Sequence, residues 1–103
     1  DIKGKTVLIA DDLISTAASI TEATRTAWDR GARDVFITAT HPVLCGPAME
    51  RLGKAKIHEC VVTDTIPLGE KRLESLHVLS VAGLFAEAIK RIHKSESVSS
   101  LFL

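Results

Sequence analysis

The sequence predicts an α/β fold, with a parallel sheet that has helices on both of its faces. Two observations support this prediction, and the chain length sets the size of the domain. Residues 5–10 form a strand-like segment whose apolar run is continuous rather than alternating, which is typical of a strand buried on both faces. Strand-like and helix-like segments then alternate along the chain, as the right-handed crossovers of a parallel sheet require. A length of 103 residues limits the chain to one small domain.

The first strand, residues 5–10, leads into a helix expected over residues 15–30. Gly31 is placed to end this helix, because glycine readily adopts the left-handed conformation that follows a helix C-terminus. The spacing of the apolar residues brings them close together on the helix: Ile20, Ala23, Ala27 and Trp28.

Three more strands and two more helices follow. The strands are expected at residues 34–40, 59–63 and 78–81. Gly46-Pro47 opens a short helix that reaches about Leu52, and the last helix is expected over residues 84–94. This last helix carries one apolar stripe, formed by Phe85, Ala88, Ile89 and Ile92.

Composition and charge exclude several classes of protein. The formal net charge is zero, whereas proteins that bind nucleic acid or a membrane surface usually carry a basic face. No apolar run approaches the roughly 20 residues that span a bilayer, and the chain does not start with a signal-peptide pattern. Cys45 and Cys60 lack metal-ligand spacing. We therefore expect two reduced thiols in a cytoplasmic protein, without nucleic-acid or membrane partners.

The start of the chain indicates a partial domain. A strand that is buried on both faces begins within a few residues of Asp1. Nothing before it in this sequence could cover its second face or pair with its free edge. We therefore expect further residues upstream of Asp1, and a larger domain of which residues 1–103 are one portion.

Polar residues gather where the first strand gives way to the first helix. In an open parallel sheet, ligands bind beyond the carboxyl ends of the strands. Asp11 and Asp12 lie there, followed by Ser15-Thr16-Ala17-Ala18-Ser19. Free N–H groups and the positive end of the helix dipole would face a ligand at this point. Small side chains allow close approach of the backbone, so the loop predicts a phosphate site.

The two carboxylates need a separate explanation, because acceptor-only groups beside a phosphate would repel it. They are explained if Asp11 and Asp12 accept hydrogen bonds from vicinal sugar hydroxyls, or hold Mg²⁺ through water. A ligand with a phosphate at one end and hydroxyl groups at the other is a sugar phosphate. The sequence therefore predicts a sugar-phosphate site, with Mg²⁺ as the cofactor and no direct protein ligand to it.

Simpler interpretations of the same residues stay open at this point. Serine or threonine before a helix is often only an N-cap, and aspartate after a strand is often only a turn former. A receiver-type signalling domain would use two acids after the first strand, with Asp64 as the phosphorylated group. That domain needs a lysine after its last strand, where this chain has Ala82 and Gly83. No P-loop pattern occurs.

Four segments resemble one known family. The loop V-L-I-A-D-D-L-I-S-T-A-A-S is similar to the phosphoribosyl-binding loop of the type I phosphoribosyltransferase fold. The segments G-A-R-D-V-F-I-T-A-T-H-P-V-L-C-G-P-A-M-E-R-L, V-V-T-D-T-I-P-L and L-F-A-E-A-I-K-R-I-H-K-S-E-S-V-S-S-L-F resemble the carboxyl-terminal part of ribose-phosphate pyrophosphokinases. The loop alone indicates only the superfamily, whereas two segments are far more specific to this family: T-D-T-I-P and E-S-V-S-S-L-F. The resemblance covers essentially the whole chain.

The resemblance implies a function for the loop. Asp11 and Asp12 would face the 2- and 3-hydroxyls of ribose 5-phosphate. Ser15, Thr16, Ala17, Ala18 and Ser19 would surround its 5-phosphate. The family transfers the diphosphoryl group of ATP to the ribose 1-hydroxyl with Mg²⁺, mostly by positioning and charge neutralisation. It also implies a cytoplasmic homo-oligomer, such as a hexamer.

The resemblance also defines what residues 1–103 lack. The ATP site, the catalytic flexible loop and a metal-binding histidine of the family lie in an upstream half. This portion would hold no catalytic residue, and alone it would not turn over. The family usually has glycine at the position of Ala18 and threonine at Ser19, which leaves a regulatory, non-catalytic paralogue as one alternative. A nucleobase phosphoribosyltransferase, which shares only the loop, is another.

Other polar residues have two interpretations each. His41 ends the second strand and could reach a ligand, or could serve in the turn. Asp64 follows the third strand and could contact a ligand, or could cap the turn before Ile66-Pro67. The serines of the tail, Ser97, Ser99 and Ser100, could belong to a regulatory nucleotide or phosphate site, as the resemblance implies, or to a frayed end.

Overall fold

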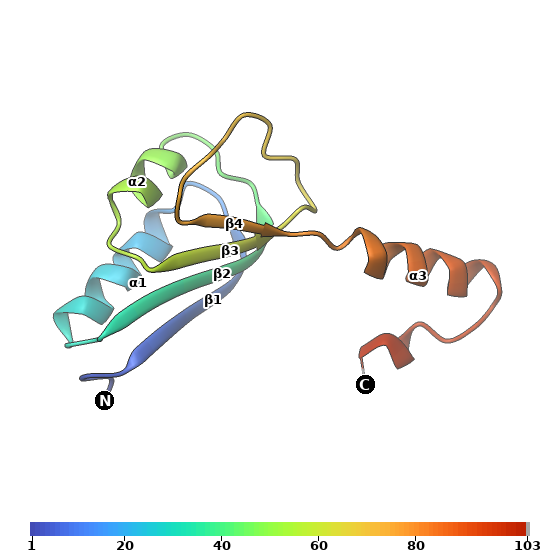
Figure 1. The fold of residues 1–103 in the computed structure, drawn as a ribbon, viewed down its shortest axis with the longest axis horizontal. Helices are drawn as coiled ribbons and strands as arrows, with labels where there is room; N and C mark the ends of the chain where they lie inside the picture. The colour runs from blue at the N-terminus through green and yellow to red at the C-terminus, as the bar shows by residue number, and fades with distance from the viewer. Residues whose placement is uncertain (103) are drawn as a thin grey trace.

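The computed structural model describes residues 1–102, and Figure 1 shows their arrangement. Four strands and three helices follow one another along the chain, before a final 3₁₀ turn at Ser99–Phe102. The elements are β1 (Thr6–Ile14), α1 (Ala18–Asp29), β2 (Asp34–Pro42), α2 (Ala48–Lys54), β3 (Glu59–Thr63), β4 (Leu76–Leu79) and α3 (Ala82–His93).

The four strands form one parallel sheet in the order β1-β2-β3-β4. The α/β class and the parallel sheet are therefore confirmed. The crossovers from β1 to β2 and from β2 to β3 each contain a helix, whereas residues 64–75 connect β3 to β4 without one. Because all strands run the same way, their carboxyl ends lie along one edge of the sheet.

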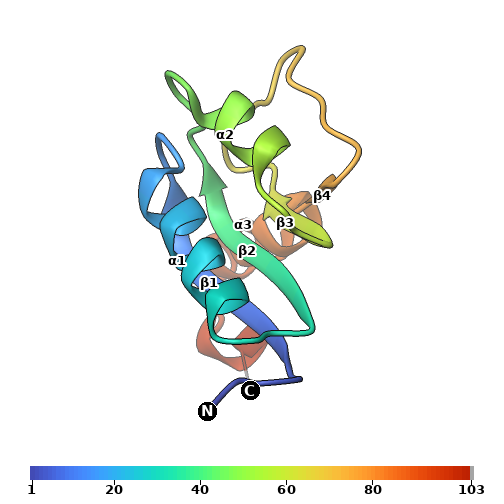
Figure 2. The same ribbon diagram turned by 90° about the vertical axis from the view of Figure 1, so that its left-hand side faces the viewer.

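One face of the sheet is covered by α1 and α2, which lie in front of the strands in Figure 2. Side chains from both helices and from the strands form a shared core on this face. Its largest fully buried members include Ile14, Ile37, Leu44 and Leu52. Alternate residues of β2 and β3 point into this core, as period-two strands require.

The other face of the sheet has no helix packed on it within residues 1–102. Leu8 of β1 is 64% exposed and Leu79 of β4 is 63% exposed. Helix α3 extends away from the sheet beyond β4 (Figure 1). Its apolar stripe is where the periodicity predicts it, but Phe85, Ile89 and Ile92 are all exposed. The expected helix cover on both faces is thus found on one face.

Several boundaries differ from those expected. β1 continues four residues beyond Ala10, because its ladder with β2 continues to the pairs Leu13↔His41 and Ile14↔Pro42. Asp11 and Asp12 therefore lie inside the strand, near its carboxyl end, and do not terminate it. Consequently α1 starts only at Ala18. β4 lies two residues earlier than expected, whereas β3 matches its predicted bounds.

The expected end of α1 is confirmed. Gly31 has a φ of 86°, and its N–H donates to the carbonyl oxygen of Trp28 at 2.9 Å. No helix within residues 1–102 has the length and apolar character needed to cross a bilayer.

Candidate functional site

The predicted loop lies between the carboxyl end of β1 and the first turn of α1. It encloses a hollow of about 160 Å³. Asp11 and Leu13 line this hollow together with every residue from 14 to 20. The structure therefore brings the five predicted phosphate-binding residues and Asp11 to one place. Asp12 is exposed beside it but does not line the hollow.

The turn into α1 depends on a left-handed residue. Ala17, the residue before the helix, has φ 66° and ψ 11°, a conformation that costs a residue with a Cβ roughly 1–2 kcal/mol. Its methyl group is only 4% exposed and belongs to the core under the sheet, and this packing offsets the strain. No side chain caps the helix. The interpretation of Ser15 and Thr16 as N-caps is therefore wrong.

The carbonyl oxygens of the turn are held from one side. Three consecutive carbonyl oxygens accept hydrogen bonds from residues 44–51. Leu44 N–H donates to Ile14 O at 2.9 Å, Cys45 N–H to Ser15 O at 3.0 Å, and Arg51 Nη1 to Thr16 O at 3.0 Å. In a trans peptide the C=O and the following N–H point in opposite directions. The N–H groups of residues 15, 16 and 17 therefore point away from residues 44–51.

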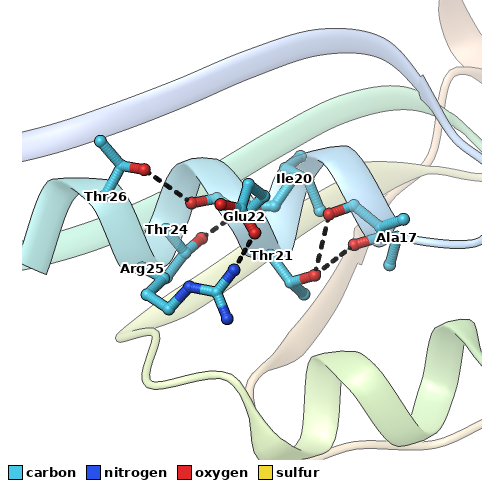
Figure 3. Close-up of polar contacts among 8 residues, drawn as sticks. Ala17, Ile20, Thr21, Glu22, Thr24, Arg25 and Thr26 are labelled. Atoms are coloured by element: carbon cyan, nitrogen blue, oxygen red, sulfur yellow. Dashed lines mark hydrogen bonds and ion pairs between the residues drawn. The ribbon is translucent and has the colours of Figure 1, made fainter.

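The first turn of α1 adds further unpaired donors. Within residues 1–102, no protein acceptor is found for the N–H groups of residues 16–20. The first backbone bond of the helix runs from Thr21 N–H to Ala17 O at 3.1 Å. Figure 3 shows that the Thr21 hydroxyl also donates to Ala17 O, at 2.6 Å. Unpaired amides at a helix N-terminus favour an anion.

The two acids differ in their surroundings. Asp11 Oδ1 accepts a hydrogen bond from the backbone N–H of Asp12 at 2.7 Å, and both residues are exposed. Asp11 also lines a second hollow, of about 280 Å³, at the carboxyl ends of the strands. Three threonines line this second hollow: Thr38, Thr40 and Thr63. The loop motif did not single them out, although each lies in or at the end of a strand whose carboxyl end borders the site.

The donor set limits what metal chemistry these residues can support. No group of three or more histidine, cysteine or acidic side chains in the described part of the chain could hold a metal ion. Two neighbouring carboxylates remain at the site, Asp11 and Asp12. Mg²⁺ commonly keeps several waters and uses one or two carboxylates with substrate phosphates, so this pair fits an indirect role and not a complete protein site.

His41 lies in a hydroxyl-rich cluster at the ends of β2 and β3. Its Nδ1 is 2.8 Å from Thr65 Oγ1. Thr63 Oγ1 donates to the carbonyl oxygen of Thr40 at 2.7 Å, and Thr65 Oγ1 lies 3.3 Å from the same oxygen. The ring of His41 therefore has a hydrogen-bond partner, but His41 does not lie in a turn: β2 continues through Pro42, two residues beyond its expected end.

The two cysteines are separate free thiols in the structure. Cys60 is buried in β3, and burial raises the pKa of its thiol to about 11. Cys45 is exposed, with its Sγ 3.3 Å from Ser15 Oγ.

Asp64 links the end of β3 to the start of α3. Its Oδ1 accepts a hydrogen bond from the N–H of Val81 at 2.8 Å. This bond, with a further one from the Ser80 side chain, lowers the pKa of the Asp64 carboxyl. Of its two interpretations, a structural one is found, but the carboxylate binds the N–H of Val81, the residue before α3, and not the turn before Ile66.

We expect the N–H signal of Val81 to report the titration of Asp64. A folded pKa below the ordinary value of roughly 3.9 means that the carboxylate stabilises the fold above that pH and loses this effect as pH falls further. In an NMR titration, the Val81 amide should shift with a midpoint below the pKa of an ordinary aspartate. In Asp64→Asn the chemical shift of the Val81 amide should not change over the same pH range. A midpoint at or above the ordinary value in the wild-type protein would contradict the contact.

The tail is attached to α3 within residues 1–102. Arg91 Nη1 donates to the carbonyl oxygen of Ser97 at 3.1 Å and also to the Ser100 hydroxyl. Ser97 and Ser99 are linked through their hydroxyl groups at 2.9 Å. The interpretation of these serines as part of a frayed end is therefore not supported.

Comparison with known proteins places this site in context. The family described as phosphoribosyl synthetase-associated domain matches residues 1–103. A ribose-phosphate pyrophosphokinase of Rhodopirellula baltica is 56% identical over 102 residues, covering 98% of this chain and 32% of the relative. The ribose-phosphate pyrophosphokinase of Bacillus subtilis is 48% identical over 103 residues, covering 99% of this chain and 32% of the relative.

A solved structure is similar over nearly the same range. The crystal structure of phosphoribosylpyrophosphate synthetase from Mycobacterium smegmatis superposes with a TM-score of 0.90 at 43% identity, covering 92% of this chain and 32% of that one. The chain thus spans about a third of the length of these relatives. Since the family match extends over every residue, the chain belongs to the phosphoribosyl synthetase-associated domain family.

Proposed function

We propose that residues 1–103 form the carboxyl-terminal, ribose-5-phosphate-binding portion of a ribose-phosphate pyrophosphokinase. The full-length protein would transfer the diphosphoryl group of ATP to the 1-hydroxyl of ribose 5-phosphate, giving phosphoribosyl diphosphate. Relatives bearing that name, at about half identity, support this activity. They are about three times longer, so we assign the ATP site and the catalytic groups to an upstream half. Residues 1–103 alone should not turn over.

The observation that carries the proposal is the orientation of the turn between β1 and α1. Its carbonyl oxygens are bonded on one side, so its N–H groups face the hollow that Asp11 also lines. A phosphate dianion in that hollow would accept hydrogen bonds from the N–H groups of residues 16–20 and from the hydroxyl groups of Ser15, Thr16 and Ser19. Asp11 and Asp12 would then accept hydrogen bonds from the ribose hydroxyls, because a carboxylate offers only acceptors.

Mg²⁺ is the cofactor that this proposal implies. When bound, it would neutralise charge on the phosphates of ATP. Asp11 and Asp12 could hold it through water, since residues 1–102 contain no cluster of three metal-ligating side chains. The role of residues 1–103 is therefore positioning: they would fix the phosphate and orient the ribose.

The remaining partners follow from the same assignment. We propose a cytoplasmic homo-oligomer, such as a hexamer, that has no nucleic-acid or membrane partner. The zero net charge supports the absence of such partners, and the exposed apolar stripe of α3 supports further protein contacts.

The function is tested on the full-length protein. Isothermal titration with ribose 5-phosphate should show binding, and incubation of ATP, Mg²⁺ and ribose 5-phosphate should release AMP. Binding without AMP release would identify a regulatory paralogue. AMP release is also what separates the proposal from a nucleobase phosphoribosyltransferase, which would instead release diphosphate from phosphoribosyl diphosphate and a base. Absence of ribose 5-phosphate binding would contradict the proposal.

A further inference from the structure

We propose that Arg51 of α2 is a positioning residue for the phosphate-binding turn. The inference rests on the proposed function of that turn. Arg51 comes from a different helix and lies 35 positions further along the chain, yet its Nη1 donates to the carbonyl oxygen of Thr16 at 3.0 Å. Its guanidinium is thus attached to the same peptide group whose N–H belongs to Ala17.

The peptide between Thr16 and Ala17 is the one whose orientation matters most. Ala17 is held at φ 66°, which is unfavourable for a residue with a Cβ, so this peptide tends to rotate away from its observed orientation. A hydrogen bond to its oxygen opposes that rotation, and it keeps the N–H of Ala17 directed away from Arg51. The neighbouring oxygens of Ile14 and Ser15 are held by backbone donors. Of the donors to these three oxygens, Arg51 is thus the one that a side-chain substitution can remove.

The charge of Arg51 acts in the same direction as its hydrogen bond. Within residues 1–102 Arg51 forms no ion pair, while Glu50 pairs with Lys54 and Glu22 pairs with Arg25. The positive charge is therefore not neutralised by a protein carboxylate. A cation that donates to the peptide oxygen polarises the peptide, which makes its N–H a stronger donor. Arg51 would thus increase the affinity for a phosphate dianion without touching it.

The surroundings of Arg51 supply a matched control. Arg51 lines a groove of about 780 Å³ between α1 and α2, together with Arg25, Trp28, Lys54 and Lys56. Arg25 points into the same groove and carries the same charge, but it bonds only to Glu22 one turn earlier (Figure 3). Arg25→Met removes a guanidinium from the groove and leaves the turn untouched.

The test compares Arg51→Met, Arg51→Lys and Arg25→Met in the full-length protein. In Arg51→Met, the Kd for ribose 5-phosphate and for inorganic phosphate should rise about tenfold, the effect of losing one charge-assisted hydrogen bond. KM for ribose 5-phosphate should rise similarly, with kcat within about twofold, since Arg51 takes no part in the chemical step. Arg51→Lys, which keeps a charged donor, should recover most of the affinity. Arg25→Met should bind as wild type does.

A measurement without ligand separates positioning from direct contact. The amide signal of Ala17 in an NMR spectrum of the ligand-free protein should shift in Arg51→Met and not in Arg25→Met, while the melting temperatures of all three variants stay close to that of wild type. An unchanged amide signal, or an unchanged Kd in Arg51→Met, would overturn the inference while leaving the proposed function intact. If wild type itself fails to bind ribose 5-phosphate, the proposed function is wrong and this inference with it.

Discussion

Replacing Asp11 and Asp12 together by asparagine should weaken ribose 5-phosphate binding by a factor of about 100 or more. Each carboxylate would accept hydrogen bonds from a ribose hydroxyl, and a hydrogen bond to a charged group is worth about 1.5–3 kcal/mol. Asparagine keeps the shape but presents one weaker acceptor and a misplaced donor. The full-length protein should consequently lose the thermal stabilisation that ribose 5-phosphate gives to the wild type.

The same double variant should bind inorganic phosphate as tightly as wild type, or more tightly. Two negative charges beside the turn repel a phosphate dianion, and the substitution removes both. Opposite responses to the two ligands therefore separate a sugar-binding role of the acids from a general loss of structure. Isothermal titration with each ligand gives the comparison.

A charge-matched control is available at the opposite edge of the sheet. Asp29 ends α1 and Asp34 starts β2, so Asp29→Asn with Asp34→Asn changes the net charge equally but far from the turn. This control should leave both affinities unchanged. Equal affinity of wild type and the Asp11/Asp12 variant for ribose 5-phosphate would refute the role given to the acids.

The parts of the fold that local sequence determines were predictable. β3 has its expected bounds, because five residues rich in β-branched side chains are bounded by a turn on each side. The stop of α1 at Gly31 was predictable for the same local reason. The end of β1 was not, because it is fixed by the pairing of Leu13 with His41 and of Ile14 with Pro42 in β2 and not by its own apolar run. The exposure of the α3 stripe likewise depends on what surrounds the helix.

The candidate site likewise has features that the local sequence determines and features that depend on residues distant in the sequence. The loop contains small and hydroxylic residues beside two acids. The chemistry of these residue types alone predicts a ligand that has an anionic group and a sugar. The left-handed position could not be assigned from sequence, and it falls on Ala17 and not on Ala18, the position at which the resemblance implies a glycine. The bonds from residues 44–51 to the turn also join segments about 30 residues apart. Only the fold brings such segments together, so Arg51 gave no signal in the sequence.

Ala18→Asp should weaken the binding of ribose 5-phosphate by about two orders of magnitude without harming the fold. Ala18 is the exposed first residue of α1, and the first turn of the helix has no acidic residue. A carboxylate there should stabilise the helix by about 0.3–1 kcal/mol through its dipole. The same carboxylate would occupy the donors meant for the phosphate and repel its charge, so the Kd should rise by a factor of about 100. Isothermal titration and thermal denaturation measure the two effects.

Two further variants make the Ala18→Asp result specific. Ala23→Asp introduces the same change at an exposed position further along α1. There it should leave binding unchanged and slightly lower the melting temperature, because aspartate is a poor helix former away from the N-terminus. Ala18→Gly should bind within about twofold of wild type, because Ala18 has no positive φ and its methyl group is exposed. A loss of ribose 5-phosphate affinity in Ala18→Asp alone requires a ligand whose negative charge lies at the start of α1. If Ala18→Asp binds ribose 5-phosphate as tightly as wild type, the phosphate lies elsewhere.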